Sequence, residues 1–230
     1  MSDLRLPERS IVSFILKDLE RKMVFLGGPR QVGKTTLGQG LLKTSGAYFN
    51  YDSPHDRKKI LNHDFDPNAG LLILDEIHKS RQWRNVLKCI YDTLNKQHRF
   101  VITGSARLDH YRKGGDSLLG RYYHYRLHPY SLRELGISRK NTEKLLKFGG
   151  FPEPLADENE STLNRWHLAR LNKLVRVDLR DLENIKDLDR VETLGESLLT
   201  RVGSPLSINN LAKDRKSTRL NSSHGYILVC

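Results

Sequence analysis

The sequence predicts an α/β fold, in which helices cover a sheet of buried strands. Two observations predict it. Aliphatic runs such as 71–74 and 99–103 are typical of strands buried in a parallel sheet. A glycine-containing loop, GPRQVGKT at 28–35, stands between the strand-like run 23–26 and the helix-like stretch 36–42. This strand–loop–helix order is the context of a phosphate-binding loop.

Composition narrows the class of protein. The 230 residues suffice for one α/β domain and a small second unit. A net charge of +12 suggests an acidic partner, either nucleotide or nucleic acid, with a solvated basic surface as the alternative. Two cysteines give no disulfide framework, and Cys89 is expected to pack in a helix. No apolar run approaches the roughly 20 residues of a membrane span. The start of the chain lacks a signal-peptide core, so we expect a cytoplasmic protein with no membrane partner.

The phosphate-binding loop has the form GxxxxGK[ST]. Its glycines let backbone N–H groups turn inward around phosphate oxygens, and the following helix start adds positive potential. Lys34 can reach the β- and γ-phosphates, and the Thr35 hydroxyl can bind Mg²⁺. The residues expected to contact nucleotide are Gly28, Pro29, Arg30, Gln31, Val32, Gly33, Lys34, Thr35 and Thr36.

Helix and strand alternate around this loop. Apolar residues in 8–21 recur near period 3.6, which predicts a helix that packs on the core or also forms part of an adenine pocket. Residues 47–51 read as a strand that ends at Asp52. That acid acts either near the metal or as a turn residue. The polar stretch 53–69 is expected to be a loop with a short helix.

Two acids follow the aliphatic strand 71–74. Ligands bind outside the carboxyl ends of strands in open α/β sheets, which is where Asp75 and Glu76 fall. We assign Asp75 to Mg²⁺ through water and Glu76 to orienting or deprotonating the water that attacks the γ-phosphate. His78 and Lys79 need not touch nucleotide, and a surface role is expected for both.

The second half of the predicted sheet carries further candidate residues. Residues 81–96 predict an amphipathic helix, and the strand 99–103 precedes Ser105. Ser105, or Thr103, is placed to sense the γ-phosphate, with a polar turn or helix cap as the alternative. A flexible segment, 106–120, leads to the fifth strand at 122–128. Arg121 before it is positioned to reach a neighbouring subunit's phosphate, and a surface salt bridge is the alternative.

The sequence predicts that further segments follow the nucleotide-binding core. We expect a nucleotide-binding core over 1–128, then helical material over 129–202 with a Gly/Pro-rich joint at 148–154. Residues 204–213 resemble the opening of a helix-turn-helix. Residues 214–224 can be back-translated into a common sequencing-library adapter, so we expect the tail 214–230 to be non-native and the native chain to run on past Lys213.

Six motifs together are very specific. They are GGPRQVGKTT at 27–36, LDEIHK at 74–79, ITGSAR at 102–107, LLGR at 118–121, HPYSLREL at 128–135 and GGFPEP at 149–154. With them the chain resembles, over 1–213, the prokaryotic AAA-superfamily ATPases that join a P-loop core to a C-terminal domain of unknown function. The resemblance implies a five-stranded parallel sheet, a Glu-bearing P-loop active site, and a helical segment. A winged helix, beginning at 203–213 and truncated here, and a nuclease-like fold follow in full-length members.

The expected function is Mg²⁺-dependent ATP hydrolysis, in a molecular switch or motor that acts on a macromolecule. Lys34 and Glu76 are the main catalytic residues, with Ser105 and Arg121 as helpers, while Thr35 and Asp75 hold the metal. A homo-oligomer is one possible state. The alternatives are a small-molecule kinase, which acceptor-dependent ADP release would reveal, and a nucleotide-gated regulator that binds DNA through the missing winged helix.

Overall fold

The computed structural model describes residues 6–42, 45–104, 118–173, 194–195 and 198. The chain divides into two compact units, Met1–Asn164 and Arg165–Cys230. The first unit contains the sheet and most of the described helices. Ser105, the winged-helix start at 203–213 and the tail 214–230 lie outside the described residues.

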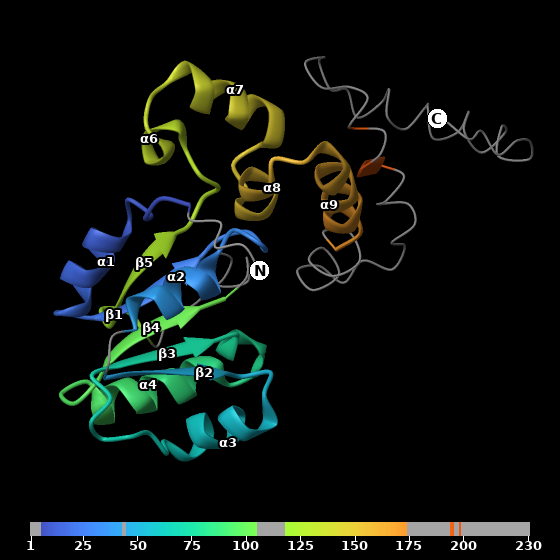
Figure 1. Ribbon diagram of the computed structural model, residues 1–230. Helices are drawn as coiled ribbons and strands as arrows, with labels where there is room; N and C mark the ends of the chain where they lie inside the picture. The colour runs from blue at the N-terminus through green and yellow to red at the C-terminus, as the bar shows by residue number, and fades with distance from the viewer. Residues whose placement is uncertain (1–5, 43–44, 105–117, 174–193, 196–197, 199–230) are drawn as a thin grey trace, which may run out of the picture. The chain divides into compact units, whose positions relative to one another are not determined.

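Five parallel strands form one sheet (Figure 1). Their order across the sheet is β2-β3-β4-β1-β5, which confirms the α/β fold with a five-stranded parallel sheet. The strands are β1 (Met23–Gly27), β2 (Gly46–Asn50), β3 (Leu71–Asp75), β4 (Arg99–Thr103) and β5 (Tyr122–Arg126).

Helices connect the strands and continue after them. Those in the sheet region are α1 (Val12–Leu19), α2 (Lys34–Leu41), α3 (Pro54–Asn62), the 3-10 turn η1 (Ile77–Lys79) and α4 (Trp83–Leu94). After β5 follow α6 (Leu132–Leu135), α7 (Arg139–Phe148), α8 (Pro152–Asp157) and α9 (Glu160–Lys173). In the described part of the chain no helix is long and apolar enough to cross a membrane.

The sheet has a buried cluster on each face. Alternate residues of a strand point to opposite faces, so Val24 and Leu26 of β1 pack with Ile15 of α1 and Leu37 of α2. The alternate residues of β1 and β3 pack against the helices on the opposite face. These include Met23, Phe25, Leu72 and Leu74, with Ile60 of α3 and Trp83, Leu87 and Ile90 of α4. Burial on both faces explains why β1, β3 and β4 read as continuous apolar runs.

Strand register brings the functional strand ends together. Asp75 of β3 is opposite Asn50 of β2 and Thr103 of β4, and Thr103 is opposite Leu26 of β1. Because the strands are parallel, their carboxyl ends meet at one edge of the sheet. The phosphate-binding loop leaves β1 at that edge, with the end of β4 between it and Asp75.

Several element boundaries differ from the predictions for local reasons. The helix expected over 8–21 is shorter, since α1 begins only at Val12. Ser53 caps α3 by accepting a hydrogen bond from the Asp56 N–H (3.4 Å), and Pro54 occupies its first turn, where a missing N–H costs nothing. Cys89 is exposed rather than packed, because the buried stripe of α4 runs through Leu87 and Ile90 on either side of it.

The Gly/Pro-rich stretch 148–154 is only partly a joint. Gly149 has a positive φ of 70° and ends α7, and the Gly150 carbonyl accepts a hydrogen bond from the Tyr130 N–H (2.7 Å). Pro152, however, already belongs to the first turn of α8. The stretch therefore both separates two helices and fastens them to the chain just after β5.

Prediction from the loop backbone. Gly28 has φ +135°, and a Cβ added there would lie 2.4 Å from the Leu127 carbonyl oxygen. Gly28→Ala should therefore lower the free energy of unfolding by about 1–3 kcal/mol, measured by urea titration. Gly40→Ala is the matched control, because a Cβ at Gly40 meets nothing within 4 Å. In α2 it should stabilise by roughly 0.5–1 kcal/mol. Equal stability of the two variants would contradict this account of Gly28.

Candidate nucleotide-binding site

The phosphate-binding loop turns through backbone conformations that few residues adopt. Gly28, Gln31 and Gly33 have φ values of 135°, 64° and 94°. Gly33 is the N-cap of α2, and Val32 is fully buried in the cluster beneath that helix. The left-handed turns combined with a helix N-terminus form the kind of concavity in which backbone N–H groups bind anions.

The side chain of Lys34 folds back over the phosphate-binding loop. Its side chain is largely buried, and Nζ donates hydrogen bonds to the carbonyl oxygens of Gly28 (3.0 Å) and Pro29 (2.8 Å). These bonds hold a positive charge against the loop. The predicted phosphate-contacting lysine is therefore in the loop's own concavity and not at the molecular surface.

Asp75 is the most heavily bonded acid of the site. It is 4% exposed, and its Oδ2 accepts hydrogen bonds from Thr35 Oγ1 (2.8 Å) and Tyr48 OH (2.7 Å). Its Oδ1 accepts one from Thr103 Oγ1 (2.5 Å). A single carboxylate thus joins the start of α2 to β2, β3 and β4. The sequence predictions for Thr35 and Asp75 place both at the metal, and here the two side chains are in direct contact.

Glu76 follows Asp75 in a left-handed conformation with φ 59°. Its N–H donates to the Thr103 carbonyl (3.0 Å), which fixes the turn out of the strand. Its Oε2 lies 3.5 Å from His78 Nε2 and 3.4 Å from Lys79 Nζ. Burial raises the pKa of Glu76, and the positive charge of Lys79 partly opposes that rise.

The two residues expected at the surface differ from each other. His78 is 5% exposed, so the expectation of a surface role for it is wrong: η1 turns the ring inward beside Glu76. Lys79 is more exposed, and its Nζ makes an ion pair with Asp52. Within the described residues, the contacts found for Asp52 are with Lys79 and Asn50.

The oxygen groups of the site suit a hard cation. Among the described residues no cluster of three or more His, Cys, Asp or Glu could hold a metal ion by itself. Mg²⁺ often takes only one or two protein carboxylates and completes its shell with water and substrate phosphates. The contacting Thr35 hydroxyl and Asp75 carboxylate fit that requirement.

A cavity of about 530 Å³ adjoins the phosphate-binding loop. Its walls come from the chain before and into α1, the end of the phosphate-binding loop, α2 along its length, Tyr130 and α8. The residues that line it include Arg9, Val12, Thr36, Tyr130 and Ala156. The segment 8–21 was expected either to pack on the core or to form part of an adenine pocket, and it does contribute to the wall of a cavity beside the loop.

Arg9 is the polar anchor of this cavity wall. It is 8% exposed, its Nε is 3.0 Å from Glu134 Oε1, and its guanidinium lies 3.9 Å above the Tyr130 ring. Its Nη2 donates to the His128 carbonyl. Arg9 thereby fastens the chain before α1 to the segment that follows β5.

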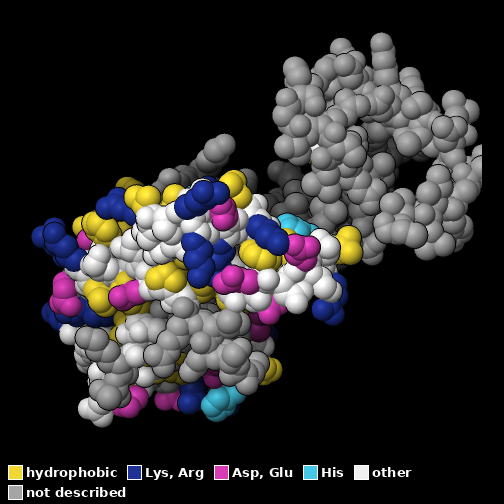
Figure 2. All heavy atoms as spheres, turned by 45° about the horizontal axis from the view of Figure 1, so that its top comes forward, with side chains coloured by type: hydrophobic (Ala, Val, Ile, Leu, Met, Phe, Trp, Pro, Cys, Tyr) yellow, Lys and Arg dark blue, Asp and Glu magenta, His cyan; other side chains and the backbone are white. Residues whose placement is uncertain are grey.

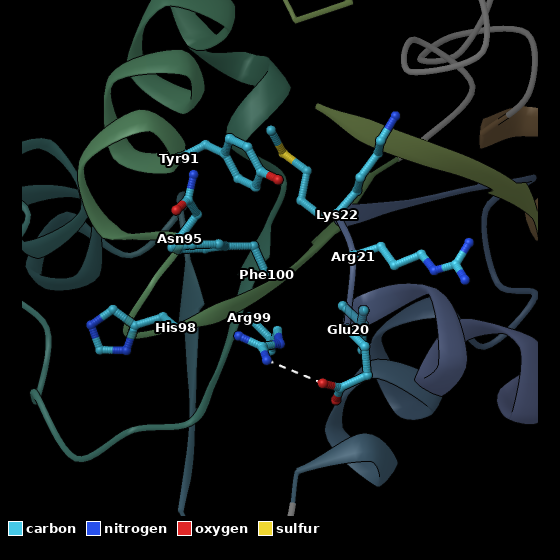
Figure 3. Close-up of a pocket in the computed structure, with 10 residues that line it drawn as sticks. Glu20, Arg21, Lys22, Tyr91, Asn95, His98, Arg99 and Phe100 are labelled. Carbon is cyan, nitrogen blue, oxygen red and sulfur yellow. Dashed lines mark hydrogen bonds and ion pairs between the residues drawn. The ribbon is translucent and has the colours of Figure 1, made fainter. Parts of the chain in front are cut away.

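A second hollow, of about 250 Å³, lies at the opposite edge of the sheet. Figure 3 shows Tyr91, Asn95 and the Arg99–Glu20 ion pair (3.1 Å) around it. These residues come from the ends of α1 and α4 and the start of β4. The hollow is therefore separated from the phosphate-binding loop by the length of the strands.

The structure brings some predicted helpers to the site and not others. Thr103 contacts Asp75, whereas Ser105, the other candidate sensor, lies outside the described residues. Arg121 immediately precedes β5, at the edge opposite the phosphate-binding loop of its own chain. Its Nε and Nη2 bind the two carboxylate oxygens of Asp92 at 2.7 and 3.0 Å. This is the surface ion pair that the sequence offered as the alternative.

Two site residues were missed from the sequence. Tyr48 was treated only as a strand residue, although a half-buried tyrosine hydroxyl needs a hydrogen-bond partner, and here that partner is Asp75. Arg9 lies before the apolar residues of the predicted first helix and belongs to no recognised motif, so nothing in the sequence was a reason to choose it. Only the three-dimensional fold, which brings 7–10 and 128–134 together, gives it a role.

Prediction for the Asp75 contacts. Tyr48→Phe removes one hydrogen bond to a buried carboxylate and should lower the free energy of unfolding by roughly 1.5–3 kcal/mol. The measurement is urea unfolding at neutral pH. Tyr91→Phe is the matched control: Tyr91 is also half-buried, and no hydrogen bond of its hydroxyl is found within the described ranges. A Tyr48→Phe protein as stable as Tyr91→Phe would refute the contribution of this bond.

The chain is similar to several known proteins. Residues 139–226 match a family model described as a domain of unknown function, and this match includes part of the 214–230 segment. Two curated relatives, uncharacterized proteins of Mycobacterium tuberculosis and Mycobacterium bovis, are each 28% identical over 167 residues, which is 70% of this chain. The chain spans 36% of the length of each of these relatives.

Solved structures of similar proteins include a Walker-type ATPase of Pyrococcus abyssi, with 16% identity, a TM-score of 0.44, and coverage of 77% of this chain and 75% of that one. Another is the ORC1 protein of Aeropyrum pernix in complex with DNA, with 15% identity, a TM-score of 0.45, and coverage of 98% and 80%. The family model described as an AAA domain matches residues 20–136. That match takes in the phosphate-binding loop, Asp75 and Glu76 and covers half of the sequence, so the chain belongs to the AAA domain family.

Proposed function

We propose that this chain binds ATP together with Mg²⁺ and hydrolyses it. The observation that carries the proposal is the 2.8 Å hydrogen bond between Thr35 Oγ1 and Asp75 Oδ2. It joins the end of a phosphate-binding loop to the acid at the end of β3. Hydroxyl and carboxylate together supply the oxygen ligands that an Mg²⁺–triphosphate complex needs.

Thr35 and Asp75 would hold the metal, and the ion would neutralise charge on the phosphate oxygens. The chain's own part is to bind and orient. Backbone N–H groups of 28–35 face the phosphates, and the Lys34 ammonium, now on the carbonyls of Gly28 and Pro29, exchanges those acceptors for phosphate oxygens. The gain is electrostatic, and it is largest in a site that excludes water.

Glu76 is the group that prepares the attacking water. It stands next to Asp75, and burial raises its pKa, which makes the carboxylate a better proton acceptor than an exposed one. Its backbone is fixed by the bond to Thr103. A positioned base of this kind contributes about 10²–10⁴-fold to a rate. Thr103 or Ser105 is proposed to sense the γ-phosphate.

The base of the nucleotide fits the cavity of about 530 Å³ beside the loop. Nucleotide sites are mostly apolar with a few placed polar groups, and this cavity combines Val12 and Ala156 with the fixed guanidinium of Arg9. A base bound there would contact both the chain before α1 and the helix α8.

The wider role that we propose is a nucleotide-driven switch or motor acting on a macromolecule. The net charge of +12 favours an acidic partner, so a DNA-binding regulator gated by nucleotide is the second candidate. On the face shown in Figure 2, Lys and Arg side chains are interspersed with Asp and Glu. Turnover measured with and without DNA separates the two candidates.

Prediction for the phosphate site. Lys34→Ala should weaken ATP binding by tenfold or more, because a charge that contacts the phosphates is lost. Glu76→Gln should bind ATP as tightly as the wild type yet lose about 10²-fold or more of turnover. Calorimetry with Mg²⁺ and ATP, together with phosphate release, measures both. Wild-type turnover in Glu76→Gln would show that the assignment of Glu76 is wrong.

Prediction for the base cavity. Ala156→Trp should fill the cavity and raise the Kd for ATP by about tenfold or more, while inorganic triphosphate binds as before. Asp157→Trp adds the same bulk at the next position, which does not line the cavity, and serves as the control. If Ala156→Trp weakened ATP and triphosphate equally, the cavity would not be the base site.

A further inference from the structure

Three charged side chains form a chain at the carboxyl ends of β2 and β3. They are Asp52, Lys79 and Glu76, with Lys79 between the two acids. Lys79 Nζ contacts Asp52 Oδ2 within hydrogen-bond distance and lies 3.4 Å from Glu76 Oε2. The second distance exceeds the usual 2.7–3.2 Å of an N–H···O bond, so the ammonium is bound more closely to Asp52 than to Glu76.

The backbone fixes this arrangement. Glu76 adopts a left-handed conformation, and the 3-10 turn Ile77–Lys79 returns the chain so that the Lys79 N–H donates to the Glu76 carbonyl (3.1 Å). Ile77 is fully buried under the turn. The Lys79 backbone therefore stays beside Glu76, and the carboxylates of both Asp52 and Glu76 are within reach of its ammonium.

Lys79 remains charged in this place. Burial alone would lower the pKa of Lys79, but the hydrogen bond to Asp52 and the charges of Glu76 and Asp52 outweigh it and raise the pKa. A carboxylate oxygen that accepts a hydrogen bond from an ammonium has fewer lone pairs left for a water molecule. How tightly Lys79 binds Glu76 thus affects what Glu76 can do.

We propose that Asp52 is a positioning residue, which holds the Lys79 ammonium away from Glu76 and so keeps the Glu76 carboxylate available to water. The inference rests on the proposed function, in which Glu76 prepares that water. The inference gives a role to Asp52, for which the sequence had left two alternatives, a residue near the metal and a turn residue.

The test is a double-mutant cycle read by turnover and by binding. Asp52→Asn keeps the shape but removes the charge, so Lys79 shifts to Glu76, and kcat should fall about fivefold. The Kd for a non-hydrolysable ATP analogue should stay unchanged. Lys79→Met should turn over at least as fast as the wild type. Asp52→Asn added to Lys79→Met should then have no effect.

A matched control and the contrary outcomes complete the experiment. Glu143→Gln breaks a more exposed ion pair remote from the site, with Arg139 on α7, and should leave kcat unchanged. The inference is overturned if Asp52→Asn turns over like the wild type, or if it lowers kcat equally with and without Lys79. A parallel loss of analogue binding would also overturn it. Absence of turnover in the wild type would instead refute the proposed function on which it rests.

Discussion

The whole site depends on one buried carboxylate. Asp75 accepts hydrogen bonds from Thr35, Tyr48 and Thr103, and each donor belongs to a different element. A buried charge is stable only when it is paired or fully hydrogen-bonded. The hydroxyls supply these bonds, and they also fix the start of α2 against β3. The geometry that holds the phosphate-binding loop near the strand-end acids is therefore the same geometry that satisfies Asp75.

Most of the sheet was predictable because both faces are buried. Continuous apolar runs mark β1, β3 and β4, and the strand–loop–helix motif marks the first connection. Strand order was harder to derive, since β4 enters between β1 and β3 and nothing in its own residues says so. Helix ends depended on caps such as Ser53. The prediction that Cys89 is packed was wrong, because a shift of one residue around a helix moves a side chain from the buried face to solvent.

The site divides in the same way. Candidate site residues that belong to a local motif, such as Lys34, Thr35, Asp75 and Glu76, could be chosen from the motif and its spacing. Residues that act through contacts distant in sequence could not. Tyr48 reaches Asp75 from a neighbouring strand, and His78 is buried by a three-residue turn that no periodicity predicts. Such contacts depend on register and packing, which follow only from the complete fold.

The ion pair between Arg9 and Glu134 has a consequence for how the chain can be trimmed. Both side chains are almost fully buried, at 9% and 7% exposure, although Arg9 stands ahead of the first helix. Removing that leading stretch would take the arginine from a buried ion pair and leave the Glu134 carboxylate on its bonds to Ser131, which is destabilising. The residues ahead of α1 are thus part of the fold, and proteolytic nicking there would also loosen the segment that follows β5.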